Sequence, residues 1–308
     1  MHAHHHGSTT RVFAWVTLIN LAYTVVEAGY GFATNSLALL TDALHNLGDV
    51  LGLGLAWAAA AMARRAPRGR HTYGWRRATL LSPLANALLL VGFSGALGWE
   101  AVRRFWAPPE VPGMPVMVVA AIGFAVNLGT AWMVRGGHEH DLNRRGAYLH
   151  LMADAAVSLA AVLAGLGLYY LGWRWLDPAI ALLIAVVVAV GAVGLLRDAF
   201  NAAMDAVPPS IDPQAVEDWL QALPGVQAVH HLHIWSLGAG EIAMTAHLVR
   251  PAKDDHDAFI DATSHALDQR FGINHPTLQI EHGESCEHDC AGRAPHGAPL
   301  HLHHHHGH

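Results

Sequence analysis

Charged side chains are scarce in this sequence of 308 residues: Asp, Glu, Lys and Arg make up 14%, and hydrophobic residues make up 53%. A soluble domain carries roughly 25% charged residues. Lys253 is the only lysine, and a formal net charge of -6 argues against nucleic acid as a partner. Two cysteines, Cys286 and Cys290, are too few for a disulfide framework. Much of the chain is therefore expected to lie where charge is costly.

Long apolar stretches are what the sequence has in place of charge. Each is near the ~20 residues that a membrane-spanning helix needs. After the last stretch, Val207-Pro208-Pro209 stops the helix, because proline lacks the amide donor. We therefore predict a mainly α membrane protein with six transmembrane helices, at about 12–33, 37–63, 78–103, 114–134, 146–171 and 177–197.

Arginine placement predicts the orientation of these spans. The loops after the second and fourth spans carry nine arginines, whereas the opposite side carries three, and positive charge marks the cytoplasmic face. Both termini are therefore predicted to be cytoplasmic. The nine are Arg64, Arg65, Arg68, Arg70, Arg76, Arg77, Arg135, Arg144 and Arg145, and the three are Arg103, Arg104 and Arg174.

The composition changes after the sixth span. The pattern there predicts a helix to about 222, strands at 226–237 and 241–249, a helix at 255–271 and a strand at 277–281. This α-β-β-α-β order is enough for a small α+β domain. We divide the chain into a His-rich cytoplasmic tail (1–11), a transmembrane transport domain (12–206), a cytoplasmic metal-binding regulatory domain (207–284) and a His-rich disordered tail (285–308).

Two apolar spans carry the same polar pair. His45 and Asp49 in the second span are one helical turn apart, and His150 and Asp154 repeat that spacing in the fifth. An ionisable side chain inside a membrane is costly and marks a candidate functional site. A structural hydrogen bond would explain a single pair equally well. Its repetition at identical spacing favours one shared site.

Two imidazoles and two carboxylates suit tetrahedral zinc, and each ligand loses metal when it is protonated. Such a site can exchange a metal ion for protons. Asp42 shares the face of His45 and Asp49 and is predicted to line the entrance or to support the ligands. Glu27 and Asn127 are predicted to orient ligands or tie helices together. Asp177 has the place of an N-cap for the sixth span.

At these residues the sequence resembles the cation diffusion facilitator family, the proton-coupled zinc transporters, over nearly the whole chain. The likeness lies in Asp42-Ala43-Leu44-His45-Asn46-Leu47-Gly48-Asp49, His71-Thr72-Tyr73-Gly74-Trp75, His150-Leu151-Met152-Ala153-Asp154, Asp177-Pro178 and His230-His231-Leu232-His233-Ile234-Trp235.

The resemblance implies a homodimer with a Y-shaped outline in the cell (inner) membrane. It implies a metallochaperone-like cytoplasmic fold and export of divalent metal from the cytoplasm by proton antiport. It also implies that His45, Asp49, His150 and Asp154 form the transport site. Relatives with Asp in place of the His45 imidazole tend toward different metal choice, so His45 favours Zn²⁺, with Cd²⁺ as a second substrate.

The resemblance further implies that His230, His247 and His282 are regulatory zinc ligands of the soluble domain. Strand alternation would place His231 and His233 on one face of the sheet and His230 on the other. The family motif usually has Asp where this chain has His231, which leaves open whether His230 or His231 binds metal.

Possible accessory metal ligands are Asp42, His71, His231, His233, Cys286 and Cys290. His71 is the only obvious ligand in a loop where some bacterial relatives have several, and Cys-x3-Cys is a weak zinc signature. The His runs at 2–6, 138–140 and 301–308 are predicted to gather metal loosely.

Other functions are less consistent with the sequence. A membrane-embedded metal sensor without transport is the alternative, although it would need an effector module. An intramembrane metalloprotease would need His-Glu-x-x-His, and His138-Glu139-His140 lacks that spacing. A channel would move metal without proton counterflow. We therefore predict a transporter and not an enzyme.

Overall fold

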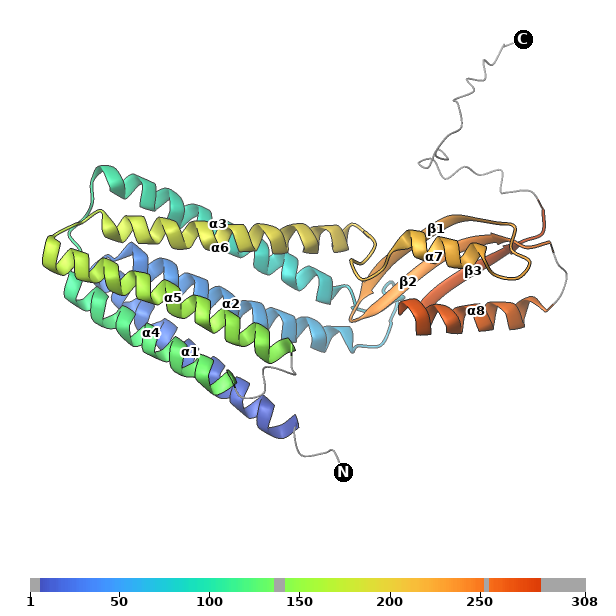
Figure 1. Ribbon diagram of the computed structural model, residues 1–308, viewed down its shortest axis with the longest axis horizontal. Coiled ribbons are helices and arrows are strands. Elements are labelled where there is room, and N and C mark those ends of the chain that lie inside the picture. Colours follow the sequence, from blue (N-terminus) through green and yellow to red (C-terminus); the bar gives the residue numbers. More distant parts are fainter. Residues whose placement is uncertain (1–5, 136–141, 252–254, 284–308) are drawn as a thin grey trace, which may run out of the picture. The chain divides into compact units, whose positions relative to one another are not determined.

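The computed structural model describes residues 6–135, 142–251 and 255–283. The chain forms two compact units, Met1–Met204 and Asp205–His308 (Figure 1). In its described residues, the first unit is built from helices, and the second combines helices with a sheet. The predicted division into four segments stays a prediction, because most of both tails lies outside the described residues.

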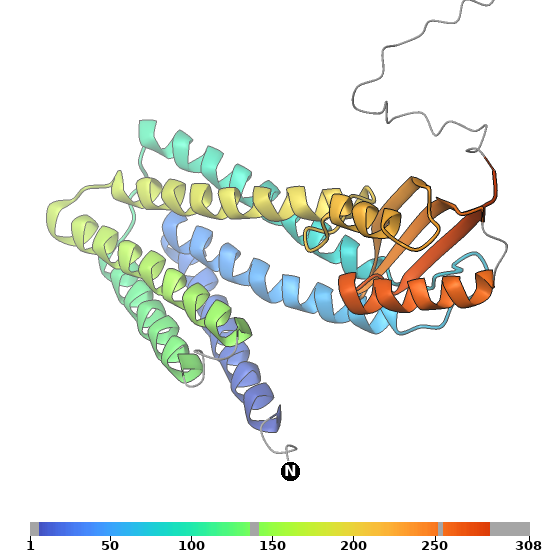
Figure 2. The ribbon, with the colours of Figure 1, turned by 45° about the vertical axis from the view of Figure 1, so that its right-hand side comes forward.

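Six helices make up the first unit, and Figure 2 shows them from a second direction. Among the described residues, α2, α3, α4, α6 and the part of α5 from Ala147 are each long and apolar enough to cross a membrane. The remaining helix, α1, packs against α2 and α4. The prediction of a mainly α membrane protein is confirmed. The bounds are α1 His6–Thr34, α2 Leu37–Ala63, α3 Ala78–Trp106, α4 Gly113–Arg135, α5 Leu142–Leu171 and α6 Leu176–Ala203.

The predicted spans differ most from the helices where a helix continues past its apolar stretch. α1 begins at His6 and not near 12, and α6 ends at Ala203 and not near 197. Helical hydrogen bonds join backbone groups and do not require apolar side chains. The apolar stretch therefore marks the membrane-crossing part of each helix and not its ends.

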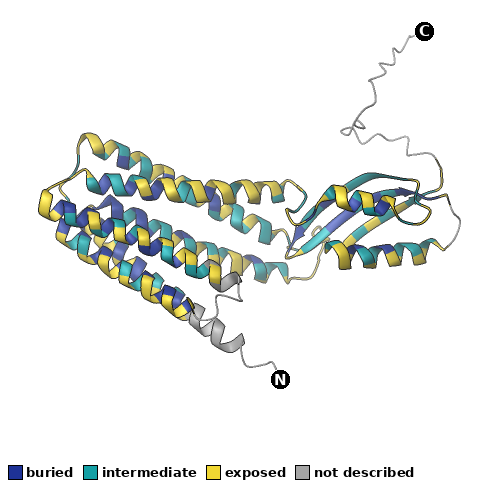
Figure 3. Ribbon diagram, in the orientation of Figure 1, coloured by how far each residue is buried: buried dark blue, intermediate teal, exposed yellow. Residues whose placement is uncertain are grey.

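Large apolar side chains face outward from this unit. Phe32, Trp57 and Val190 are each exposed over 70% or more of their surface, and exposed positions recur along the helices in Figure 3. A water-soluble monomer rarely exposes a large contiguous apolar surface. In a bilayer these side chains contact lipid tails, as the high hydropathy of the helices requires.

Two glycines bring α4 and α5 into close contact. A Cβ atom on Gly113 would lie 2.6 Å from the backbone nitrogen of Tyr169, and one on Gly165 would lie 2.7 Å from that of Met117. Small residues allow membrane helices to approach this closely. α5, which carries His150 and Asp154, is thereby held against α4.

The prediction that Asp177 is the N-cap of α6 is wrong. It lies inside the first turn of α6, and its buried carboxylate accepts hydrogen bonds from the Ser36 hydroxyl at 2.5 Å and the Leu37 N–H at 2.8 Å. Ser36 is the N-cap of α2, and its oxygen accepts from the Leu39 N–H. The sequence predicted a local cap, but the carboxylate completes the cap of a different helix.

The second unit has two helices and three strands in the predicted order. Strand β2 lies in the centre, antiparallel to β1 and parallel to β3. The parallel pair is joined through α8, as a parallel connection requires. The bounds are α7 Pro213–Gln221, β1 Ala228–Gly238, β2 Glu241–Val249, α8 His256–Phe271 and β3 His275–Glu281.

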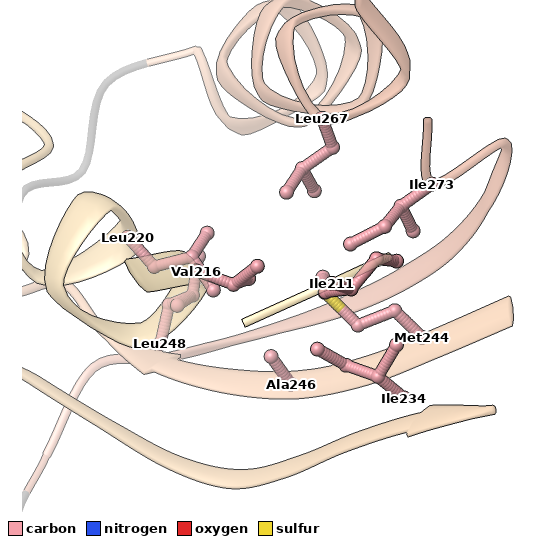
Figure 4. Packing of buried hydrophobic residues seen from close by; sticks show 9 residues of the cluster. All are labelled: Ile211, Val216, Leu220, Ile234, Met244, Ala246, Leu248, Leu267 and Ile273. Carbon is pink, nitrogen blue, oxygen red and sulfur yellow. The ribbon is translucent and has the colours of Figure 1, made fainter. Parts of the chain in front are cut away.

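One face of this sheet carries the apolar core. Figure 4 shows Val216 and Leu220 of α7 and Leu267 of α8 packing toward Met244 and Leu248 of β2. Side chains alternate along a strand, so the residue between Ala246 and Leu248 points to the opposite face of the sheet. That residue is His247.

Candidate metal centres

Four side chains from α2 and α5 form a closed ring in the helical unit. His45 Nε2 lies 3.9 Å from Asp49 Oδ2 and 3.5 Å from Asp154 Oδ1. His150 Nε2 lies 3.1 Å from Asp49 Oδ2 and 3.6 Å from Asp154 Oδ2. Imidazole and carboxylate therefore alternate around the ring, and the rings of His45 and His150 meet edge to face at 6.0 Å between centroids.

The helical period explains how the ring forms. Within each helix, the spacing of four residues places His and Asp on one face. His45–Asp154 and His150–Asp49 then link the two helices. The sequence could supply the two pairs, but only packing brings them together.

The ring is buried on one side and open on the other. The Asp154 side chain is 6% exposed, whereas that of His150 is 47% exposed. The Asp49 carboxylate is intermediate. The ring is therefore exposed at the surface of the helical unit on the side of His150 and Asp49.

Asp42 is not a member of this ring and does not line an entrance, because it is fully buried. Its Oδ2 accepts a hydrogen bond from the Ser158 hydroxyl at 3.4 Å, and Asn127 of α4 donates to the same hydroxyl at 3.3 Å. Glu27 of α1 is also fully buried and accepts from the Tyr23 hydroxyl at 2.7 Å. These groups tie α1, α2, α4 and α5 together behind the ligands, as predicted for Glu27 and Asn127.

A second group of possible ligands lies on the open face of the soluble sheet. His230, His231 and His247 each offer a ring nitrogen, and these nitrogens all lie within 4.8 Å of one another. The rings of His231 and His247 stack at 4.7 Å between centroids. Three imidazoles so close together form a donor set suited to zinc.

A β-bulge creates this group and corrects the expected strand alternation. His230 pairs with His247 and His233 pairs with Thr245, so two residues of β1 oppose one of β2. His231 adopts a left-handed backbone conformation with φ 52°. The bulge therefore turns consecutive histidines 230 and 231 to the same face, against the prediction that they point apart, while His233 stays exposed.

Glu281 is the functional candidate that the sequence did not single out. At the end of β3, its Oε2 lies 2.9 Å from His230 Nε2 and its Oε1 lies 2.9 Å from His247 Nδ1. Its only signal in the sequence is its place beside His282. The parallel pairing of β2 with β3 brings it to the histidines.

The remaining predicted ligands lie elsewhere. His282 does not join the group of three, and its ring lies 4.8 Å from that of His256. His71 stacks on Trp75 at 4.3 Å, and no group of three or more potential ligands includes it in the described part of the chain. Cys286 and Cys290 lie outside the described residues, as do the His runs at 138–140 and 301–308.

Comparison with known protein families matches both units of the chain. Residues 14–202 match the cation efflux transmembrane domain, and residues 208–283 match the cytoplasmic domain of cation efflux proteins. The two matches meet near the boundary between the compact units.

Full-length relatives show the same likeness. The chain is 34% identical to the zinc transporter ZitB of Escherichia coli (strain K12) over 314 residues, 99% of each chain. It is 32% identical to the cadmium, cobalt and zinc/H(+)-K(+) antiporter of Bacillus subtilis (strain 168) over 295 residues, 94% of each. It is 34% identical to the metal cation efflux system protein CzcD of Cupriavidus metallidurans over 282 residues, 91% of this chain and 89% of the relative.

Proposed function

This chain belongs to the cation efflux family of membrane transporters, and we propose that it exports Zn²⁺ from the cytoplasm in exchange for protons. Its membership confirms the resemblance to the cation diffusion facilitators and makes it a multi-pass membrane protein of metal cation efflux. The proposal includes Zn²⁺ as the main transported ion, with Cd²⁺ second, and proton antiport as the mechanism. It also includes location in the inner membrane with both termini in the cytoplasm.

The closed ring of His45, Asp49, His150 and Asp154 is the observation that carries this proposal. Its four contacts between neighbouring side chains measure 3.1–3.9 Å, whereas donors across the ring lie farther apart than those of the soluble histidine group, so a bound ion would draw the four side chains together. Two neutral imidazoles and two carboxylates match the ligand number and type of tetrahedral zinc. Two carboxylates also neutralise the charge of the divalent ion in a part of the protein where charge is costly.

Proton exchange follows from the chemistry of these ligands. Zn²⁺ enters from the open side of the ring, beside His150 and Asp49, and sheds water as it binds. After the helices rearrange to the outward-facing state, protons arriving at His45 or His150 compete with the metal for the ring nitrogens. Coordination weakens, the ion leaves, and the protonated carrier returns.

The soluble unit supports a regulatory role. His230, His231, His247 and Glu281 would hold a divalent metal on the face of the sheet that the helices leave open. A metal there would stabilise one arrangement of a homodimer and so shift the population of active carrier. His282, beside His256, remains a candidate for a neighbouring ligand.

Metal uptake into proteoliposomes with an imposed pH gradient tests the proposal. The intact protein should accumulate Zn²⁺ against its gradient and move protons in the opposite direction. Asp49→Ala and Asp154→Ala should abolish both fluxes. Metal flux without proton counterflow would indicate a channel, and metal binding without any flux would indicate a membrane-embedded sensor.

A further inference from the structure

A pair of carboxyl groups lies behind the metal-binding ring and is not used by the mechanism above. Glu27 of α1 and Asp42 of α2 are both fully buried, and the amide of Asn46, one helical turn from Asp42 on α2, donates to Glu27 Oε2 at 3.4 Å, which makes the two carboxyl groups neighbours. Glu27 contacts none of the four ring residues in the hydrogen bonds and ion pairs of the described residues. The pair therefore needs an explanation separate from metal ligation.

The surroundings of the pair supply hydrogen-bond donors and no permanent cation. The Tyr23 hydroxyl donates to Glu27 Oε1 at 2.7 Å, and the Asn46 amide donates to Glu27 Oε2 at 3.4 Å. The Ser158 hydroxyl donates to Asp42 Oδ2. No arginine, lysine or protonated amine contacts either carboxyl among the described residues. Ionising both of two neighbouring buried carboxyl groups is strongly unfavourable under these conditions.

One oxygen of the pair is left without a donor. Asp42 Oδ1 is buried and has no hydrogen-bond partner in the described part of the chain. A buried acceptor without a partner is costly. If one carboxyl of the pair carries a proton, it can donate that proton in a hydrogen bond to the other carboxyl. The pair itself can therefore supply the donor that Asp42 Oδ1 lacks.

The ring lies close enough to this pair for the two to interact electrostatically. The titratable groups that face it are Tyr23 of α1, His45 of α2 and Asp154 of α5, and Asn127 and Ser158 are the neutral groups that reach it from α4 and α5. His45 and Asp154 are both members of the ring. A divalent ion bound by them would favour loss of a proton from Asp42 and Glu27.

We infer that Glu27 and Asp42 share one proton while the ring is empty and release it when metal binds. The pair is thus a proton site that does not ligate the metal, and it contributes one of the protons exchanged for each ion. No bond other than O–H is made or broken: the proton leaves the carboxyl pair as the ion arrives, and a proton returns as the ion departs. This inference rests on the proposed metal/proton antiport and adds a site to it.

Counting protons released per metal ion tests the shared site. Purified full-length protein in detergent is titrated with Zn²⁺ in weakly buffered solution at fixed pH, and the released protons are read from an indicator dye. Glu27→Gln should release about one proton fewer than the wild type and bind Zn²⁺ about tenfold more weakly. The affinity falls because a neutral Gln beside ionised Asp42 keeps a single negative charge, whereas the wild-type pair gains a second negative charge when it loses its proton to the solution.

Sharing makes a sharper expectation for the double variant. Asp42→Asn should lose the same proton as Glu27→Gln, and the variant with both changes should lose no more than either alone. A full wild-type proton count in Glu27→Gln would overturn the inference, as would a loss of two protons in the double variant. Loss of Zn²⁺ binding in both single variants would make the pair purely structural and would also overturn it.

The same titration separates this inference from the proposed function. If the wild type binds Zn²⁺ without releasing any proton, the antiport proposal fails. If the wild type releases protons and Glu27→Gln releases as many, only the shared site fails. If the number of protons released changes when K⁺ and Na⁺ are replaced by choline, the pair binds a monovalent cation. That result would overturn the proton assignment.

Discussion

His150 Nε2 on α5 lies 3.1 Å from Asp49 Oδ2 on α2, which makes the proposed ligands themselves a link between the two helices. His45 and Asp154 form the return link at 3.5 Å. Each ligand therefore has one partner in its own helix and one in the other helix. The geometry of the ring depends on the helix packing, and any movement of α5 relative to α2 changes the ring.

Removing one carboxylate from the ring should abolish high-affinity binding in the membrane unit. Asp154→Asn and Asp49→Asn each retain side-chain size but lose the charge that a divalent ion needs. We expect Zn²⁺ affinity to fall by roughly 100-fold or more, beyond the effect of altering a residue that only supports a ligand. Equilibrium binding and vesicle transport measure this. Asp198→Asn, at an exposed position of α6, is the matched control and should behave like the wild type.

Replacing an imidazole by a carboxylate in the ring should change metal preference. His45→Asp converts the donor set to three carboxylates and one imidazole. Imidazole suits zinc, whereas carboxylates suit Mn²⁺ and other hard ions. We expect the preference for Zn²⁺ over Mn²⁺ in competitive transport to fall by about tenfold. An unchanged ratio, with transport intact, would mean that His45 does not contact the ion.

The soluble histidine group offers a substitution that separates metal binding from folding. His231→Gly removes one imidazole, and glycine tolerates the left-handed backbone at φ 52°. The stability of the metal-free protein should stay within about 1 kcal/mol of wild type, since relieved strain offsets the flexibility of glycine. Zn²⁺ affinity of the soluble unit should fall about tenfold or more.

That affinity is best measured in full-length protein carrying Asp49→Ala and Asp154→Ala, because these changes remove both carboxylate ligands of the membrane ring. His233→Gly provides the control, because His233 lies two residues away, is exposed and belongs to no ligand group among the described residues. Equal losses from both glycine variants would show that general loosening of β1 and not ligation sets the affinity.

Sequence reasoning reached the fold and the ring because both depend on local periodicity. Apolar runs of membrane length predict helices directly, and a spacing of four places His45 with Asp49 whatever the tertiary structure. It failed where backbone irregularity or distant contacts decide. The bulge at His231 breaks strand alternation, and Glu281 reaches the histidines only through parallel pairing of β3. Asp177 likewise caps a helix that begins 140 residues earlier in the chain.

The cap that Asp177 provides to α2 should be a large local contribution to stability. Asp177→Ala would leave the buried Ser36 hydroxyl and the Leu37 N–H without their acceptor. We expect a loss of about 2–4 kcal/mol, from the cap and the unsatisfied donors together. Thermal unfolding in detergent reports it as a lower Tm. Asp177→Asn keeps one acceptor oxygen and should lose less, so equal losses from Ala and Asn would contradict the proposed hydrogen bonds.

Close packing of α4 on α5 should matter to the ring even though it lies away from the ligands. Gly165→Ala would place a methyl group 2.7 Å from the Met117 backbone nitrogen, so one of the two helices has to move. Overpacking of this kind costs about 1–3 kcal/mol. Because α5 carries His150 and Asp154, its displacement should also weaken Zn²⁺ binding. Gly129→Ala in α4 is the control, since its methyl group would meet nothing within 4 Å. A Tm and Zn²⁺ affinity equal in the two variants would mean that α4 does not hold α5 in place.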